Sequence, residues 1–313
     1  MRVLLTGSRG MLGSSLLSHL RSSGDDVDII APSRTELDLR DSAAVGRFVE
    51  ETQPNAVIHA AAKVAGIAAK MAAPFDFLMD NLLIDSSVIA AAARLAVPRL
   101  LYVGTAAAYP AEYRRPFVES DLLTGALEAP NEGYALAKIS AAKLCQYASA
   151  QYGVTYRAVL PSNLYGPHDH FGSGDAHLVA ACLTKVHRAH VEGLPAVDVW
   201  GDGTARREFT YSEDLADWLV SQLDRLDTWP DWLNVGVGQD HSVAEYYEIA
   251  CDVVGYRGQL RFDRTKPSGV PQRLIDSSQA RQLGWRPTTS LRDGMSAAYA
   301  AFRANSTPTR EAV

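Results

Sequence analysis

Cysteine is scarce in this sequence, and its few occurrences lie far apart. Three cysteines occur among 313 residues, at Cys145, Cys182 and Cys251. Their odd number and wide spacing exclude a disulfide framework and favour a reducing, cytoplasmic location. No cysteine or histidine spacing resembles a zinc site, since the nearest pattern, "HDH" at 168–170, lacks further ligands. We therefore expect no metal centre.

Long apolar runs and an excess of basic residues are also missing. No run approaches the ~18–20 consecutive apolar residues of a membrane helix, so we expect no membrane partner. The N-terminus enters a strand pattern directly, so we expect no signal peptide. The net charge is −6, whereas a protein that neutralises nucleic-acid phosphates needs a basic excess. We therefore expect no nucleic-acid partner.

Short apolar runs alternate with helical patterns over the first half of the chain. Buried strands are predicted at 2–7, 26–33, 56–62, 99–105 and 156–161, and helices at 11–22, 42–53, 81–95 and 134–152. This alternation predicts an α/β fold with a Rossmann-like, doubly wound parallel sheet.

The pattern loosens beyond Pro161, where a helix near 177–191 and strands at 197–203 and 233–238 are predicted. The chain length fits one large domain or two intimate ones. We expect a Rossmann domain for NADP over 1–165, to which later segments at roughly 200–238 return. A smaller, interleaved C-terminal domain, mainly 166–313, is expected to bind the substrate.

The first predicted strand runs into a glycine-rich turn, "TGSRGMLG". Gly7, Gly10 and Gly13 form a G-x-x-G-x-x-G array that opens a helix near Met11. Glycine allows a tight turn and the close approach of a pyrophosphate, and the helix N-terminus supplies N–H groups and a positive dipole end. These glycines and Met11 are therefore predicted to bind a dinucleotide.

The residues after the second predicted strand indicate which dinucleotide binds. An NAD site usually has an acidic residue there to hold the ribose 2′-OH, but this chain has Arg34, and Arg9 lies inside the glycine turn. Two guanidinium groups favour a 2′-phosphate and therefore NADPH. The alternative is that both are solvated surface side chains. Asp38 and Leu39 are predicted to lie against the adenine.

Tyr134 and Lys138 lie four residues apart in "YALAK", so both side chains share one face of a predicted helix. The lysine charge is expected to lower the pKa of Tyr134, which then donates a proton to a developing alkoxide. This spacing alone is common, and the alternative is a surface tyrosine packed near a lysine stem. Its place after the glycine turn and after the strand ending at Thr105 favours a catalytic pair.

Six stretches, spread over nearly the entire chain, carry a family resemblance. They are "AAKVAGI" (61–67), "NLLIDSSVIAAA" (81–92), "PFVESDLLTGALEAPNEGYALAKISAAKLC" (116–145), "LPSNLYGPHDHF" (160–171), "VWGDGTARREF" (199–209) and "KPSGVPQRLID" (266–276). On these residues the chain resembles the extended short-chain dehydrogenases/reductases, and among them the GDP-L-fucose synthase branch. The resemblance implies a nucleotide-diphospho-sugar substrate and a homodimer formed through the two long helices.

The resemblance also implies a role for each matching residue. Tyr134 would be the general acid, and Lys138 its partner, which also holds the nicotinamide ribose. Thr105 stands at the family's catalytic serine, and His177 at the histidine that does acid–base work at the carbons next to C4. The matching substrate-binding residues are Asn163, Lys185 (an arginine in most relatives), Trp200 and Arg207. His177 as a loop residue and Trp200 as a core aromatic are the alternatives.

The stretch "YVGTAAAYP" (102–110) departs from the family, which reads Gly-Ser-Ser-Cys-x-Tyr-Pro from Gly104 onwards. Ala107 occupies the cysteine position, and a methyl group cannot transfer the proton that epimerisation at C3 and C5 requires. We therefore expect NADPH-dependent reduction of the C4 ketone of a dTDP- or GDP-linked 4-keto-6-deoxyhexose, with little or no epimerisation.

Three other functions stay open at this point. One is a bifunctional GDP-L-fucose synthase that uses another acid, such as water, in place of cysteine. The second is a nucleotide-sugar 4-epimerase with recycled NAD, which Arg9 and Arg34 disfavour because they indicate NADPH. The third is a non-catalytic nucleotide-binding or regulatory protein, against which the intact Thr105, Tyr134 and Lys138 speak.

Overall fold

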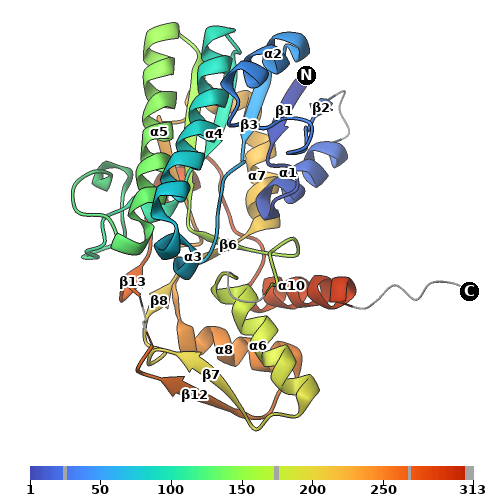
Figure 1. Cartoon of the computed structure of the whole chain (residues 1–313), viewed down its shortest axis with the longest axis vertical. Coiled ribbons are helices and arrows are strands. Elements are labelled where there is room, and N and C mark those ends of the chain that lie inside the picture. The colour runs from blue at the N-terminus through green and yellow to red at the C-terminus, as the bar shows by residue number, and fades with distance from the viewer. Residues whose placement is uncertain (24–26, 173–175, 267–268, 307–313) are drawn as a thin grey trace, which may run out of the picture.

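A six-stranded sheet forms the centre of the molecule (Figure 1). The structure is a computed structural model, which describes residues 1–23, 27–172, 176–266 and 269–306. The strand order is β10-β5-β4-β3-β1-β2, and every neighbouring pair is parallel. The strands are β1 (Arg2–Thr6), β2 (Asp28–Ile30), β3 (Ala56–His59), β4 (Arg99–Val103), β5 (Thr155–Pro161) and β10 (Trp232–Val235). The predicted Rossmann-like α/β fold is confirmed.

Helices cover both faces of this sheet (Figure 1). α2 (Ser42–Thr52), α4 (Pro74–Arg94) and α5 (Glu132–Tyr152) pack on one face, and α1 (Met11–Ser22) and α7 (Ser212–Gln222) on the other. Alternate strand residues serve the two cores: Val3 and Leu5 pack with α1 and α7, whereas Leu4 packs with α2 and α4. Burial on both faces explains why the strands read as continuous apolar runs.

A smaller unit lies below the sheet in Figure 1. Its core joins α6 (Leu178–Glu192), α8 (Val243–Val254) and α10 (Leu291–Ser306) to the parallel pair β7 (Ala196–Trp200) and β12 (Gln259–Asp263). Two further small sheets are β11 (His241–Ser242) with β8 (Arg206–Arg207) and β13 (Gln272–Arg273), and β6 (Asn163–Tyr165) with β9 (Phe209–Tyr211). The remaining helices are α3 (Ile67–Ala72) and α9 (Ser278–Gln282).

The chain passes between the two units more than once. It returns to the large sheet at α7 and β10, and α9 later adds Ala280 to the core beneath α7. The returning segment begins at Ser212, because 196–211 supply strands to the small sheets. The helix predicted at 81–95 begins earlier, at Pro74, since proline fits the first turn of a helix, where its missing N–H costs nothing. None of the helices in the described ranges combines the length and the hydropathy of a membrane-spanning segment.

Candidate active site

The glycine-rich turn after β1 has the backbone geometry that its sequence predicts. Gly7 has a φ of +75°, and a Cβ there would lie 2.6 Å from the backbone nitrogen of Ala61. A Cβ at Gly13 would overlap the carbonyl of Gly7. Gly10 differs, because the nearest protein atom would be 3.4 Å from its Cβ. The absence of a side chain at Gly10 therefore leaves room for a ligand and relieves no clash with the protein.

This turn ends at the N-terminus of α1, which begins at Met11. Gly10 precedes the helix, and among the described residues no side chain caps it. The first N–H groups of a helix have no acceptor inside the helix, and the helix dipole places its positive end there. The residues present therefore fit the pyrophosphate of a dinucleotide.

Both arginines of the predicted 2′-phosphate site are exposed at this end of the sheet. Hydrogen bonds from Ser33 lower the pKa of Glu36, and the charge of Arg9 adds to the effect. Hydrogen bonds from Arg40 hold the pKa of Asp38 at about 2, and the charge of Arg34 contributes. Arg9 and Arg34 thus both lie within electrostatic reach of the segment that follows β2.

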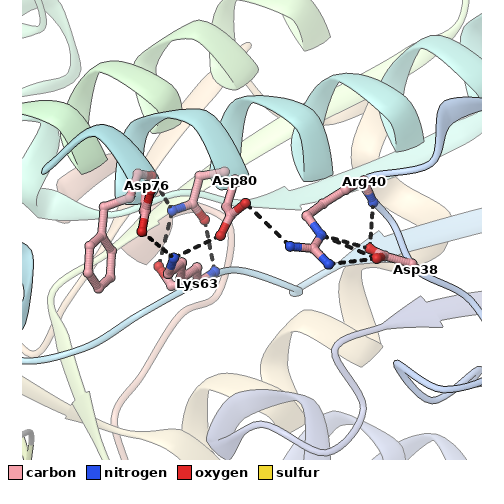
Figure 2. A network of polar contacts seen from close by, with 7 residues as sticks. Asp38, Arg40, Lys63, Asp76 and Asp80 are labelled. Carbon is pink, nitrogen blue, oxygen red and sulfur yellow. Dashed lines mark hydrogen bonds and ion pairs between the residues drawn. The ribbon is translucent and has the colours of Figure 1, made fainter. Parts of the chain in front are cut away.

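Asp38, which is predicted to lie against the adenine, is held by Arg40 (Figure 2). The Arg40 Nη2 and Nε donate to the Asp38 carboxylate at 2.7 Å and 3.0 Å. On the other side, Arg40 Nη1 lies 3.5 Å from Asp80 on α4, and Lys63 Nζ lies 2.8 Å from the same carboxylate. This network braces the loop that carries Asp38 and the half-buried Leu39 against α4.

Thr105 and Tyr134 meet at the carboxyl end of β4. The Thr105 hydroxyl accepts a hydrogen bond from the Ala107 N–H at 3.1 Å, and it also hydrogen-bonds the Tyr134 phenol. Tyr134 lies in the first turn of α5 and is 7% exposed. The structure therefore brings together the two side chains that the sequence predicts to bind the keto oxygen.

The expectation that Lys138 lowers the pKa of Tyr134 is contradicted. Burial raises the pKa of Tyr134, the charge of Asp85 raises it further, and the hydrogen bond from Thr105 lowers it. Lys138 lies on α5, four residues after Tyr134, but its Nζ is 3.5 Å from the Asp85 carboxylate. Because the Asp85 carboxylate offsets the positive charge of the ammonium, Lys138 does little to lower the pKa of the Tyr134 phenol.

Asp85 is the centre of a buried polar cluster with Lys138. Its carboxylate accepts a hydrogen bond from Tyr102 at 2.7 Å and lies 3.0 Å from His59 Nε2, while the other ring nitrogen of His59 lies 2.6 Å from the Thr6 hydroxyl. All five residues are at most 2% exposed. Burial lowers the pKa of Lys138, and Asp85 opposes that effect. Burial alone would raise the pKa of Asp85, but Lys138, His59 and Tyr102 outweigh it and the pKa is lowered.

The three alanines of the 102–110 stretch form one 3₁₀ turn, Ala106–Ala108. Ala106 and Ala108 are buried in a small core with Tyr109, whereas Ala107, at the cysteine position, is half-buried. Arg273 Nη1 donates to the Ala106 carbonyl at 2.8 Å. The turn is therefore held by its core side chains and by Arg273, and the position of the family's proton donor carries a methyl group.

A lysine that no sequence pattern indicates lies against Tyr134. Lys70, on α3, places its Nζ 4.5 Å from the centroid of the Tyr134 ring and donates to Asn131 Oδ1 at 3.0 Å. Burial lowers the pKa of Lys70 to about 8, and Glu128 opposes the shift. Burial and then the charge of Lys70 lower the pKa of His177, which is half-buried before α6. The neutral form of His177 is therefore favoured near neutral pH.

Arg207 lies on β8 in the smaller unit and reaches towards the turn that precedes α5. Burial lowers its pKa, the charge of Glu128 raises it and that of Arg273 lowers it, so these three charged groups are neighbours. The adjacent Arg206 instead pairs with Asp240 at 2.9 Å. Of the two arginines, the structure brings Arg207 to the residues around Tyr134 and Ala106.

Trp200 ends β7 and is 56% exposed, so it is not a core aromatic. The ammonium groups of Lys185 and Lys266 lie 5.5 Å and 5.8 Å from its ring centroid. Asn163, exposed at the start of β6, donates to the Glu208 carbonyl at 3.1 Å. An exposed aromatic face between two cations suits a base and its phosphates.

Sequence reasoning missed four charged residues that the structure brings to this site. Asp85, Glu128 and Arg273 lie inside the stretches that carry the family resemblance, and a charged residue among apolar neighbours was the available signal. Lys70 follows "AAKVAGI" by three residues, in a short helix with no informative pattern.

Comparisons with known proteins agree with this geometry. Residues 3–236 match the NAD dependent epimerase/dehydratase family. A GDP-L-fucose synthase from Sinorhizobium fredii is 40% identical over 304 residues, which cover 97% of this chain and 96% of the relative. A GDP-L-colitose synthase from Yersinia pseudotuberculosis is 38% identical over 297 residues, which cover 95% and 96%.

Among solved structures, a GDP-mannoheptose C4 reductase from Campylobacter jejuni, with NADP bound, has a TM-score of 0.88 and 30% identity. The similarity covers 96% of this chain and 98% of the reductase. The span 3–236 that matches the family contains the glycine turn, Thr105, Tyr134 and Lys138. The chain therefore belongs to the NAD dependent epimerase/dehydratase family, within the extended short-chain dehydrogenases/reductases.

Proposed function

We propose that this protein reduces the C4 ketone of a GDP-linked 4-keto-6-deoxyhexose with NADPH and does not epimerise C3 or C5. The observation that carries this proposal is the hydrogen-bonded pair Thr105–Tyr134 beside the half-buried Ala107. The groups that protonate an alkoxide are in place, whereas the position next to them has no transferable proton. The relatives support the nucleotide and the cofactor, since their names specify GDP sugars and one solved relative has NADP bound.

Tyr134 is the proposed proton donor. When bound, NADPH supplies the hydride that C4 receives. Tyr134 then protonates the C4 oxygen, and Thr105 stabilises the developing charge through its hydroxyl. Because burial raises the pKa of Tyr134, the phenol stays protonated at neutral pH and carries the proton that it donates. The transfer remains favourable because an alkoxide is a much stronger base than a phenolate.

The cofactor and the sugar nucleotide are assigned to different elements. The glycine turn and the first N–H groups of α1 would hold the NADPH pyrophosphate, and Arg9 and Arg34 the 2′-phosphate. Lys138 would hold the nicotinamide ribose. On the substrate side, Arg207 and Lys185 would bind the diphosphate, with Trp200 against the base and Asn163 oriented towards the substrate. Anchoring the substrate far from C4 converts binding energy into orientation of the ketone.

Two features support the absence of epimerisation. Cys145 and Cys182 are fully buried in the cores of α5 and α6, where burial raises the pKa of each thiol, so neither substitutes for the missing cysteine. His177 is held neutral by burial and by Lys70. A neutral imidazole can accept a proton from carbon, but the protonated acid that returns one on the opposite face is lacking.

A turnover screen with isotope analysis tests the proposal. GDP- and dTDP-linked 4-keto-6-deoxysugars are offered with NADPH or NADH in heavy water, and the product is examined by NMR. We expect turnover of the GDP-linked ketone with NADPH and no enzyme-dependent deuterium at C3 or C5. Reactions without enzyme control for spontaneous exchange. Stoichiometric deuterium at either carbon would replace this proposal by a bifunctional GDP-L-fucose synthase.

We also propose that the protein forms a homodimer through α4 and α5, which lie side by side at one edge of the molecule (Figure 1). Exposed apolar side chains gather on these helices: Phe75 and Met79 on α4, and Leu136, Leu144 and Tyr147 on α5. Clustered exposed apolar side chains of this kind mark protein interfaces. Light scattering should give a dimer for the wild type and a monomer for Tyr147→Glu. Val191→Glu, at a similarly exposed apolar position on α6, is the matched control.

A further inference from the structure

Lys70 is a buried cation at the site, and the proposed reaction gives it no contact with the substrate. It lies on α3, at the foot of α4 between the sheet and the smaller unit (Figure 1), and is 8% exposed. Its Nζ lies 4.5 Å from the centroid of the Tyr134 ring. The ammonium is therefore held over the face of the side chain that we propose as the proton donor.

The partners of Lys70 leave its charge uncompensated by a direct ion pair. Within the described part of the chain, its hydrogen-bond acceptor is the neutral Asn131 Oδ1, at 3.0 Å, and no carboxylate pairs with it directly. Glu128 acts on Lys70 only through its charge, because its carboxylate accepts from Asn131 Nδ2 at 2.8 Å and lies 3.4 Å from Arg273. An ammonium has three N–H donors, so an oxygen ligand at Lys70 would improve the solvation of a buried charge.

A cavity of about 250 Å³ lies beside this ammonium. Met71, Pro74, Phe77 and Pro130 give it apolar walls, and Lys70 and Tyr134 are its polar members. Mostly apolar walls with a few polar groups are typical of small-ligand sites. His177, at the start of α6, lies within electrostatic reach of Lys70. The cavity therefore adjoins residues that the proposed function places around the sugar.

We propose that Lys70 binds the sugar directly, donating a hydrogen bond from its ammonium to an oxygen of the 4-keto sugar while Tyr134 protonates the C4 oxygen. This inference rests on the proposed function. It makes Lys70 a determinant of substrate choice, since a sugar with an oxygen facing α3 satisfies the ammonium and a sugar without one leaves it buried and unsolvated.

The test compares wild type, Lys70→Met and Lys70→Arg with GDP-4-keto-6-deoxymannose as the probe. Kinetics are measured with NADPH, and binding of the same sugar nucleotide is measured by calorimetry in the presence of NADP. Loss of one charged hydrogen bond predicts a rise in sugar KM and Kd of about 10- to 100-fold in Lys70→Met, with partial recovery in Lys70→Arg. The NADPH KM should stay unchanged. Lys143→Met, whose lysine lies over Trp232 away from the site, is the matched control.

The pH profile provides a readout that a purely structural role would not change. The titratable groups that face Lys70 are Tyr134, Glu128 and His177. The pKa of Lys70 is lowered to about 8, whereas that of Tyr134 is raised and that of His177 is lowered. Wild-type kcat/KM for the sugar nucleotide should therefore fall above about pH 8, as Lys70 loses its proton, and this limb should be lost in Lys70→Met.

The outcomes separate this inference from the proposed function. Equal sugar Kd values for wild type and Lys70→Met, with unchanged NADPH binding and thermal unfolding, would overturn the role of Lys70. If wild type binds the sugar nucleotide without reducing it, the proposed function fails and the calorimetry still decides on Lys70. If wild type does not bind it, both proposals fail. Should Lys70→Met not fold, Lys70→Gln takes its place in the comparison.

Discussion

Two lysines contact Tyr134 or its immediate surroundings, and their environments differ. Lys138 lies 3.5 Å from the Asp85 carboxylate, inside a cluster whose members are at most 2% exposed. Lys70 is bound to the neutral Asn131 and borders a cavity of about 250 Å³. Burial lowers the pKa of both, but a carboxylate hydrogen-bonds only Lys138.

This difference distinguishes a charge compensated during folding from one that we expect a ligand to compensate. In a buried ion pair, removing one partner leaves the other charged and desolvated, so the stability of the cluster around Asp85 depends on both charged partners. A buried cation hydrogen-bonded to an amide keeps donors for a further acceptor. We therefore expect mutations on the Lys138 side to affect stability and mutations on the Lys70 side to affect substrate binding.

The largest effect on activity should come from Tyr134, whose ring lies under the Lys70 ammonium. Tyr134→Phe removes the proton donor and keeps the ring that packs against Lys70, so kcat should fall by about 10³-fold. NADPH affinity, measured by fluorescence titration, should remain close to that of wild type. A kcat above a tenth of the wild-type value would assign the proton to another group.

Asp85→Asn should destabilise the protein by removing the carboxylate that pairs with Lys138. Because it leaves the Lys138 ammonium buried without a carboxylate, we expect a loss of roughly 3–5 kcal/mol in the free energy of unfolding, measured by urea denaturation. Asp80→Asn, in the more open network of Figure 2, should cost less than about 1 kcal/mol and is the control. Equal losses in the two variants would show that the buried cluster contributes no more to the free energy of unfolding than the exposed network does.

The same cluster predicts a pH dependence of stability. Burial alone would raise the pKa of Asp85, but its partners lower it in the folded state. The stabilisation is therefore present above the unfolded-state pKa, about 3.9, and is lost as the pH falls through the lower folded-state pKa. Urea denaturation at a series of acidic pH values should show a weaker dependence on pH for Asp85→Asn than for wild type.

Arg34→Ala should have a moderate effect that is confined to the cofactor. If Arg34 binds the 2′-phosphate, its loss should raise the KM for NADPH by about 10-fold or more and leave the KM for NADH unchanged. Steady-state kinetics with both cofactors provide the measurement, and Arg21→Ala, on the exposed end of α1, is the control. An equal rise for NADPH and NADH would refute the 2′-phosphate assignment.

Ala107→Cys should have the smallest effect on the rate of C4 reduction, and it tests proton exchange at C3 and C5 of the sugar. A thiol at the half-buried Ala107 restores a transferable proton without disturbing the buried Ala106 and Ala108. C4 reduction should continue at nearly the wild-type rate, and deuterium should appear at C3 or C5 of the product in heavy water. Ala107→Ser, with a hydroxyl too weakly acidic to donate, is the control. Absence of deuterium in Ala107→Cys would place the block to epimerisation elsewhere in the site.

The Rossmann part of the molecule could be predicted from the sequence because the patterns that indicate it lie within short segments. Strands buried on both faces give unbroken apolar runs, and Gly7 and Gly13 are required by backbone contacts within one turn. Most of the smaller unit could not be read, since β8, β11 and β13 are two residues long and carry no periodicity. Their pairing depends on segments that are far apart in the chain.

By itself, the sequence determined the fold class, the glycine turn, the side chains Thr105, Tyr134 and Lys138, and the alanine at position 107. The glycine turn and the Tyr134–Lys138 pair follow from residue types at short spacings, which fix geometry within one helix or turn, whereas Thr105 and Ala107 were identified from the family resemblance. Only the tertiary structure decided the charges around Tyr134: α4 brings Asp85 to Lys138, and α3 brings Lys70 to the phenol ring. The physical reason is that electrostatic effects act through space and depend on burial, and both depend on packing between segments distant in the chain.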